Sequence, residues 1–408
     1  MRMKFNKSGQ LLLVSAASLL AAGLVTACGT LTADFVFVTS SRAAGPNSYG
    51  EVNVFEVNSE SGHMRQIPAS PFPSGGRNPV AEAVSSDHQN LYVVNHDDNT
   101  IVQFVIGNDG KLYPQNTTNT PGVFPMAVAV SGANLFVLDT YQPLPTCSTA
   151  APCSGSLAVY PVQAASGSVV DGTLGAPVAN GGLNYWPLGL QNNPTHVLQP
   201  TGINVLASGN EVFVTAFDTT ANAGYVFGFA VGTGGALTPV AGSPWPAGSN
   251  PSAVASDATG SYLYVTDSAN GVVRGYSISS GTFTPLAGSP YAAGNQPSAI
   301  VVDSTAGYAF VANSADSSVS AYSVGSGGAL AWLGDPKTGG NGTFATGLQP
   351  VAIGIDPSTH HFLYTANFLG NNVSAFELTN TNGPLINTQN SPFASNAQPT
   401  AIAAVPHK

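Results

Sequence analysis

Three observations on the 408-residue sequence predict an all-β fold, a seven-bladed β-propeller of four-stranded antiparallel blades. A proline followed by a short apolar run recurs seven times, at intervals of 46 to 53 residues apart from one of 75. Two further strand signals accompany each recurrence, and 46 Gly and 30 Pro separate the short elements by turns. Units of this length with four strands each are typical of propeller blades, which bury their faces against one another.

The strands of each unit can be placed in order. The first strand opens at Pro79, Pro125, Pro200, Pro251, Pro297, Pro350 and Pro399. The second is aromatic and β-branched and ends near Asn or Asp, at residues 35–41, 91–97, 135–141, 212–218, 263–269, 309–315 and 363–369. The third follows at 52–58, 101–107, 157–163, 225–231, 272–278, 319–325 and 373–379.

A Gly-containing turn and a weaker fourth strand end each unit. Ser-Pro-aromatic recurs there at residues 70–72, 243–245, 289–291 and 391–393, and we expect these aromatic side chains to pack between neighbouring blades. Arg274 interrupts an otherwise apolar third strand, and we expect its side chain to face the solvent.

The two ends of the repeat array favour a closed ring over a linear solenoid. The first unit lacks its proline strand, and the last unit consists only of that strand, from Pro399 to Val405. We therefore expect the C-terminal strand to complete the sheet begun by residues 35–72, which removes exposed sheet edges.

Residues 1–27 have the organisation of a bacterial lipoprotein signal peptide. Three basic groups precede the apolar run 11–24. This run is too short to span a bilayer, because a transmembrane helix needs roughly 20 apolar residues. Val25-Thr26-Ala27-Cys28 follows and resembles a lipobox, so we expect Cys28 to be lipidated, 28–33 to be a tether and 34–408 to be the propeller. An ordinary secretory signal with an incidental cysteine is the alternative. We expect export and a lipid anchor in the cell envelope.

Composition restricts the possible partners. Only 7% of residues are charged, and without the three basic residues of the leader 7 basic residues stand against 20 acidic ones. This balance argues against a nucleic-acid partner. We expect a monomer that needs no metal and no cofactor, with a carbohydrate or another envelope protein as possible partner.

Two cysteines remain after the leader. Cys147 and Cys153 lie six residues apart between two apolar runs, and an exported protein folds in an oxidising compartment. We therefore expect a disulfide that closes this loop.

The repeated strands also resemble a known family. The segments LYVVN, LYVTD and FVANS, each before a polar turn and a V-x-x-[FY] strand, are similar to YVTN-type and lactonase-type seven-bladed propellers, over essentially all of 34–406. The resemblance implies a relation to 6-phosphogluconolactonases and cycloisomerase-like proteins, and to exported propellers without assigned chemistry. The His-containing stretch after the strand-opening proline that is typical of the lactonases is absent here, as are G-x-S-x-G, H-E-x-x-H and P-loop motifs.

Any ligand site should lie where the loops after the second strands and before the first strands share one face of the ring. The residues that we expect to line this face are Asp98, Tyr185, Trp186, Asp218, Asp267, Asn313 and Asn367. Asn and Asp at strand ends also stabilise turns by bonding to nearby backbone, which is the alternative role for them. Tyr185 and Trp186 belong to the insertion 181–199, which we expect either to reach the pocket mouth or to pack on itself.

Two functions remain open. Sparse ionisable chemistry favours a lipid-anchored binding or scaffold propeller, because acid–base catalysis needs positioned titratable groups. The alternative is a lactone hydrolase, whose candidate catalytic residues are Arg77, His96, Asp97, Asp139 and His196. Convergence of His96 and His196 with Arg77 in one hydrogen-bond network would favour the enzyme.

Overall fold

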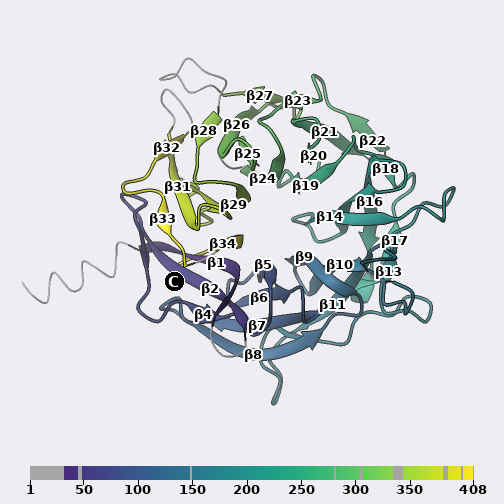
Figure 1. Ribbon diagram of the computed structural model, residues 1–408, viewed down its shortest axis with the longest axis horizontal. Coiled ribbons are helices and arrows are strands. Elements are labelled where there is room, and N and C mark those ends of the chain that lie inside the picture. Colours follow the sequence, from purple (N-terminus) through teal and green to yellow (C-terminus); the bar gives the residue numbers. More distant parts are fainter. Residues whose placement is uncertain are drawn as a thin grey trace, which may run out of the picture.

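Seven sheets surround a central axis in the structure, a computed structural model (Figure 1). It describes residues 32–44, 48–147, 149–279, 282–303, 305, 307–333, 343–379, 385–396 and 398–407. The expected signal peptide 1–27, the lipidation site Cys28 and the first part of the tether lie outside the described residues. Among the described residues, no helix has the length and apolar character needed to cross a membrane.

Each sheet is one blade, and the blades are numbered here along the chain from the blade that contains β1. The innermost strands, which line the axis in Figure 1, are the proline strands β34 (Pro399–Pro406), β5 (Pro79–Val84), β9 (Val123–Ser131), β14 (Leu198–Val205), β19 (Pro251–Ser256), β24 (Pro297–Asp303) and β29 (Pro350–Ile355). The second strands are β1 (Thr32–Ala44), β6 (Asn90–Asn95), β10 (Asn134–Tyr141), β15 (Glu211–Asp218), β20 (Tyr262–Asp267), β25 (Tyr308–Asn313) and β30 (Phe362–Asn367). The third strands are β2 (Tyr49–Asn58), β7 (Thr100–Ile106), β11 (Ser156–Gln163), β16 (Ala223–Val231), β21 (Val272–Ser279), β26 (Ser318–Val324) and β31 (Asn372–Leu378).

The fourth strand is one piece in blade 2 and two pieces in the others. Blade 2 has β8 (Leu112–Asn119). The two-piece strands are β3 (Met64–Gln66) with β4 (Phe72–Pro73), β12 (Thr173–Leu174) with β13 (Trp186–Pro187), β17 (Leu237–Pro239) with β18 (Trp245–Pro246), β22 (Thr282–Pro285) with β23 (Tyr291–Ala292), β27 (Leu330–Trp332) with β28 (Thr343–Ala345), and β32 (Leu385–Asn387) with β33 (Phe393–Ala394). A single 3-10 turn, η1 (Thr233–Gly235), precedes β17 in the described part of the chain.

Ring closure follows the prediction. The strands of blade 1 pair antiparallel in the order β34, β1, β2 and β3, so the two ends of the chain share one sheet. Strand β1 begins at Thr32, two residues before the expected start of the propeller. Because β34 pairs with the inner edge of β1, the backbone groups along that edge have hydrogen-bond partners.

The core lies in the seams between blades. Seven apolar clusters are buried, and each joins the facing sides of two adjacent blades. A blade is covered on both faces, which explains why the second strands are apolar at successive positions instead of alternating. Burial of one large apolar side chain stabilises a fold by about 1.5–3 kcal/mol. Because such side chains lie in all seven seams, every seam contributes to the stability of the ring.

The Ser-Pro-aromatic repeat explains the divided fourth strand. At each of its four occurrences the serine hydroxyl accepts a hydrogen bond from a third-strand N–H, over 2.8 to 3.0 Å, where no fourth-strand carbonyl is available. The aromatic that follows packs across a seam, as Trp245 does on Phe283 of the next blade with ring centroids 4.8 Å apart. The prediction that these aromatics pack between blades is therefore confirmed.

Trp186 is a further member of this aromatic set. It neither reaches a pocket mouth nor packs only within its own loop, the two placements that we expected for the insertion. It pairs with Leu157 on the third strand, in the register that Trp245 has with Val226, and its indole N–H donates to the Leu237 carbonyl over 3.1 Å. Tyr185 beside it is also buried. The insertion thus supplies the core aromatic of blade 3, on the outer part of the ring.

Candidate functional site

The turns after the second strands and the loops before the proline strands meet on one face of the ring, as predicted, and we call this the upper face. Its turns and loops are joined by short contacts. The backbone N–H of Arg77, in a loop, donates to Asp98, in a turn, over 2.8 Å, and the N–H of Asn295 donates to Asp316 over 2.6 Å. The carboxylate of the turn therefore fixes the loop that leads into the same blade.

In blade 2 this junction carries five polar residues that form one network, the blade 2 cluster: Arg77, Asn78, His96, Asp97 and Asp98. The Arg77 side chain donates to Asp98 over 2.6 Å through Nε. His96 Nδ1 and Asn78 Nδ2 both approach Asp97 Oδ1, at 2.7 and 3.1 Å. His96 and Arg77, two predicted catalytic residues, thus lie in one hydrogen-bond network.

Charge pairing sets the ionisation of this network. Partial burial acts to raise the pKa of Asp97, but hydrogen bonds from His96 and Asn78 and the charge of Arg77 outweigh it, so the pKa lies below its usual range. The hydrogen bond to Asp98 raises the pKa of Arg77. Asp97 is therefore a carboxylate at neutral pH, and a carboxylate holds the imidazole with its Nδ1 proton directed inward and Nε2 free.

An aromatic side chain from blade 3 completes the cluster. The Phe124 ring stacks on His96, with centroids 4.6 Å apart and ring planes 6° apart, and Tyr141 contacts the Phe124 ring edge-on. Phe124 has a φ of 59°, a left-handed conformation that is unusual for a bulky residue. The Phe124 N–H donates to the Asn99 side chain over 2.7 Å, which helps to hold this conformation.

Comparison of the blades shows that Phe124 is an exception. The residue before the strand-opening proline is an amide in the other six units: Asn78, Gln199, Asn250, Gln296, Gln349 and Gln398. His96 likewise stands where the matching turns of blades 5 and 6 have Ser268 and Ser314. These departures from the repeat meet at one point on the upper face. Comparison of the repeats with one another is the sequence signal that identifies Phe124, because Phe is not a catalytic residue type.

A second His–carboxylate pair lies on blade 4. His196 Nδ1 is 2.6 Å from Asp218 Oδ2, and the side chain of Asp218 is fully buried while that of His196 is 22% exposed. The backbone N–H groups of Thr220 and Ala221 donate to the other Asp218 oxygen. Burial acts to raise the pKa of Asp218, but the bonds from His196 and these two N–H groups outweigh it, so its pKa lies below the usual range.

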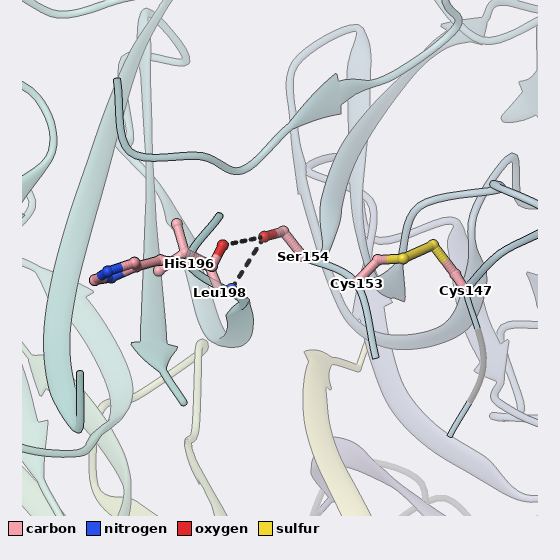
Figure 2. Close-up of a disulfide and its surroundings, with 5 residues drawn as sticks. All are labelled: Cys147, Cys153, Ser154, His196 and Leu198. Atoms are coloured by element: carbon pink, nitrogen blue, oxygen red, sulfur yellow. Dashed lines mark hydrogen bonds between the residues drawn. A yellow bond between two sulfur atoms is a disulfide. The ribbon is translucent and has the colours of Figure 1, made fainter. Parts of the chain in front are cut away.

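The disulfide loop of blade 3 lies beside this pair. Cys147 and Cys153 are joined by a disulfide, as expected. Figure 2 shows that the adjacent Ser154 hydroxyl donates to the His196 carbonyl and accepts from the Leu198 N–H, over 3.2 and 3.0 Å. Among the described residues no hydrogen bond joins His196 to Arg77 or His96, so the predicted convergence holds for His96 alone.

The carboxylates and amides that end the second strands do not line an open face, contrary to the predicted ligand ring. The fully buried members are Asn95, Asp139, Asp218, Asp267, Asn313 and Asn367. They bind nearby loop groups instead: Gly122 N–H donates to Asp139 Oδ2 over 3.1 Å, and Gly294 N–H donates to Asn313 over 3.1 Å. The other Asp139 oxygen, Oδ1, is buried without a hydrogen-bond partner. These residues stabilise the upper-face loops, which was the alternative role considered for them.

The fit at these positions is close. A Cβ added at Gly122 would lie 2.3 Å from the Cβ of Asp139, and one at Gly294 would lie 2.6 Å from the Asn313 side chain. Only glycine allows the loop to approach the strand end so closely. Asp139, predicted to be catalytic, is enclosed in this way, and burial raises its pKa to about 7.

The Arg274 side chain is 27% exposed, so it reaches the solvent only in part and is not free there as expected. Its guanidinium lies 3.1 Å from the buried Asp267 carboxylate, which also accepts from the backbone N–H groups of Ser249 and Asn250. Asp267 is thus a structural ion-pair partner. No group of three or more His, Cys, Asp or Glu that could hold a metal ion occurs within the described ranges.

Comparisons with known proteins agree with the architecture. A family model described as "Lactonase, 7-bladed beta-propeller" matches residues 47–170 and 211–343. A search of curated proteins returns no match to this chain. The solved structures that are similar in fold include two bacterial proteins. A protein assigned as a 6-phosphogluconolactonase from Bacteroides fragilis is 17% identical, with a TM-score of 0.71 over 92% of this chain and 98% of that chain. The periplasmic gluconolactonase of Pseudomonas aeruginosa is 18% identical, with a TM-score of 0.69 over 91% of this chain and 99% of that chain.

Proposed function

This chain belongs to the lactonase family of seven-bladed β-propellers, and from that premise we propose that it hydrolyses a lactone at the blade 2 cluster. The observation that supports the proposal is the network that brings His96, Asp97 and Arg77 together on the upper face. The family description and the names of the two similar structures do not support the binding or scaffold function that we expected first.

Each residue of the cluster has a role in the proposed reaction. Asp97 orients His96 through Nδ1, and His96 Nε2 removes a proton from a water molecule that attacks the lactone carbonyl. The carbonyl oxygen becomes an oxyanion, and Arg77 stabilises it through the N–H groups that its bonds to Asp98 and to the Asp97 carbonyl leave available. His96 then returns the proton to the ring oxygen as the ester C–O bond breaks, and the product is an open-chain hydroxy acid.

The cations on the described surface favour an uncharged lactone over a phosphorylated one. The four basic side chains that the structure describes are each already paired with a carboxylate: Arg65 with Glu56, Arg77 with Asp98, Lys111 with Asp109 and Arg274 with Asp267. A phosphate group is best held by several free donors. We therefore propose an aldonolactone without phosphate, or a similar neutral ester ring, as substrate.

The test is hydrolysis of glucono-1,5-lactone, other neutral aldonolactones and 6-phosphogluconolactone by the purified protein, with spontaneous hydrolysis subtracted. We expect His96→Gln to lower kcat/KM on the best neutral lactone by about 10²–10⁴-fold, because general-base catalysis contributes that much. Asp97→Asn should lower it less, because the imidazole remains. Turnover by wild type that is unchanged in His96→Gln would exclude the blade 2 cluster, and absence of turnover on every lactone would exclude the proposed function.

His196→Gln is the matched control, because His196 also contacts a carboxylate on the upper face. We expect this variant to keep activity within about threefold of wild type, since no oxyanion-stabilising cation adjoins His196 among the described residues. If His196→Gln loses activity and His96→Gln does not, the catalytic base is on blade 4.

We also propose that the protein is exported and held by lipid on Cys28 with the upper face directed away from the membrane. Strand β1 pairs Ser40 with Pro399 at the upper end and Asp34 with Pro406 at the other end, so its start at Thr32 lies opposite the cluster. Labelled palmitate should enter the wild-type protein in bacterial cells and should not enter Cys28→Ser. Equal labelling of the two proteins would contradict the anchor.

A further inference from the structure

Glu82 departs from the repeat at a position that is otherwise apolar. The third residue after the strand-opening proline is Val or Ile in the six other units: Val128, Ile203, Val254, Ile300, Ile353 and Ile402. Each of these six side chains packs in an apolar seam cluster. A carboxyl at this position forgoes that packing, so packing alone does not account for it.

Glu82 lies at the seam between blade 2 and blade 1, where the ring closes. The Thr39 hydroxyl of β1 donates to Glu82 Oε2 over 2.5 Å, and Oε1 is buried without a hydrogen-bond partner. The backbone of Ala403, on the C-terminal strand β34, also lies near enough to interact with the carboxyl. Glu82 therefore contacts strands from both ends of the chain.

A second side chain crosses the same junction. The Thr400 hydroxyl of β34 lies 3.1 Å from the Thr39 carbonyl and 3.0 Å from the Pro79 carbonyl of β5. Strands β1, β34 and β5 are thus joined by polar side chains in addition to the apolar seam. A buried carboxyl oxygen without a hydrogen-bond partner destabilises the fold strongly when the carboxyl is ionised and much less when the carboxyl is protonated.

We propose that Glu82 is a protonation-dependent latch on ring closure: the neutral carboxyl holds β1 and β34 against blade 2, and its ionisation loosens the closing blade. This device is independent of the proposed hydrolase function. It makes the contact between blade 1 and blade 2 weaker as the pH rises.

Two other titratable side chains are described on the strands around β5, and one of them adds a pH effect of its own. The strands packed against β5 are β1, β34, β6 and β9, and their described titratable side chains are Asp34 on β1 and Tyr92 on β6. Tyr92 bonds to Gly172 of blade 3. Asp34 lies at the other end of β1, beside Asp356 of blade 7, and burial raises its pKa to about 9, so its ionisation also weakens β1 as the pH rises. Burial raises the pKa of Glu82 to about 7, and the Thr39 hydroxyl and the backbone of Thr39 and Ala403 offset this only in part.

The sign of the pH effect follows from the raised value. Some groups have a higher pKa in the folded protein than in the unfolded protein. Such a group stabilises the fold fully at a pH below its unfolded-state pKa, and this contribution is lost as the pH rises through its folded-state pKa. For Glu82 this contribution is lost between the ordinary pKa of 4.5 and the raised pKa of about 7, and the loss is complete above that range. The closing blade is therefore tightest in mildly acidic solution.

The test is hydrogen exchange of the full mature protein at pH 5.5 and 8.5, with rates corrected for the intrinsic pH dependence of exchange. In wild type we expect protection of peptides from β34 and β1 to fall by roughly tenfold or more between these pH values, while peptides from β20 and β21 change little. Glu82→Gln, which cannot ionise, and Glu82→Ile, which restores the side chain of the other blades, should both reduce this pH dependence several-fold, and the part that Asp34 contributes should remain.

Glu211→Gln is the matched control, because Glu211 also has a pKa raised by burial but lies on β15, away from the closing blade. It should leave the pH dependence of β34 as in wild type. The same loss of protection in wild type and in both Glu82 variants would overturn the latch, as would a wild type whose β34 protection does not change with pH. If Glu82→Gln fails to fold, Glu82→Ile decides the outcome.

Discussion

Asp139 was predicted to be catalytic because it is a carboxylate at a strand end, but it is fully buried. It occupies the same position as Asn95, Asn313 and Asn367, at the end of a second strand, and all four are fully buried against upper-face loops. An amide satisfies this position without charge. The carboxyl of Asp139 is instead held with a pKa raised to about 7 by burial, which the bonds from Thr120 and Gly122 only partly offset.

Asp139→Asn should therefore stabilise the protein in alkaline solution. The folded pKa is above the unfolded value of 3.8, so the stability that Asp139 contributes is complete at low pH and lost as the pH rises through about 7. At pH 8.5 the variant should be more stable by about 1–2 kcal/mol, and at pH 5 the two proteins should differ little. Urea unfolding at both pH values measures this, and a variant less stable at pH 8.5 would contradict it.

At the scale of the element, the divided fourth strand depends on one hydroxyl per blade. Ser243 accepts the Gly228 N–H over 2.9 Å at the point where β17 ends and before β18 begins. The aromatic that follows then reaches the next blade. The same arrangement recurs at Ser70, Ser289 and Ser391, so the sequence repeat reflects a repeated hydrogen bond as well as a repeated core contact.

Ser243→Ala should lower the free energy of unfolding by about 1 kcal/mol, because it leaves the Gly228 N–H without its acceptor. Ser208→Ala is a suitable control, since Ser208 lies in an exposed turn and its loss should change stability by less than about 0.5 kcal/mol. The measurement is denaturant unfolding of both variants beside wild type. Equal effects of the two substitutions would show that the Ser243 bond contributes nothing specific.

At the scale of the whole molecule, stability is distributed over seven seams, and the ring holds because the last strand covers the first. The C-terminal strand contributes Val405 to the seam with blade 2 and Ile402 to the seam with blade 7. It also pairs along β1 from Asp34 to Ser40. Loss of this one strand would expose both seams and an inner sheet edge together.

Truncation before Pro399 should destabilise the protein by more than about 3 kcal/mol and expose apolar surface that binds a hydrophobic dye. A shorter truncation after Pro406 keeps β34 and should cost less than about 1 kcal/mol. Thermal unfolding with and without the dye measures both. Similar melting temperatures for the two truncated proteins would show that the C-terminal strand does not close the ring.

The sequence by itself determined the number of blades, the order of their strands and the closure of the ring. Each of these depends on a short local pattern, a proline, an apolar run or a polar turn, that recurs once in every unit. Strand formation follows such local patterns. It also indicated Arg77, His96 and Asp97, which lie in one loop and one turn of the same blade.

Only the tertiary structure decided which polar residues meet and which are enclosed. Phe124 joins His96 from a different blade, and Asp139, Asp267, Asn313 and Asn367 turn inward to bind loops. Trp186 enters the core although its segment is an insertion. A residue type and its spacing state what a side chain can do, but burial and partners depend on contacts between segments far apart in the chain, and those contacts set the charge and accessibility of the site.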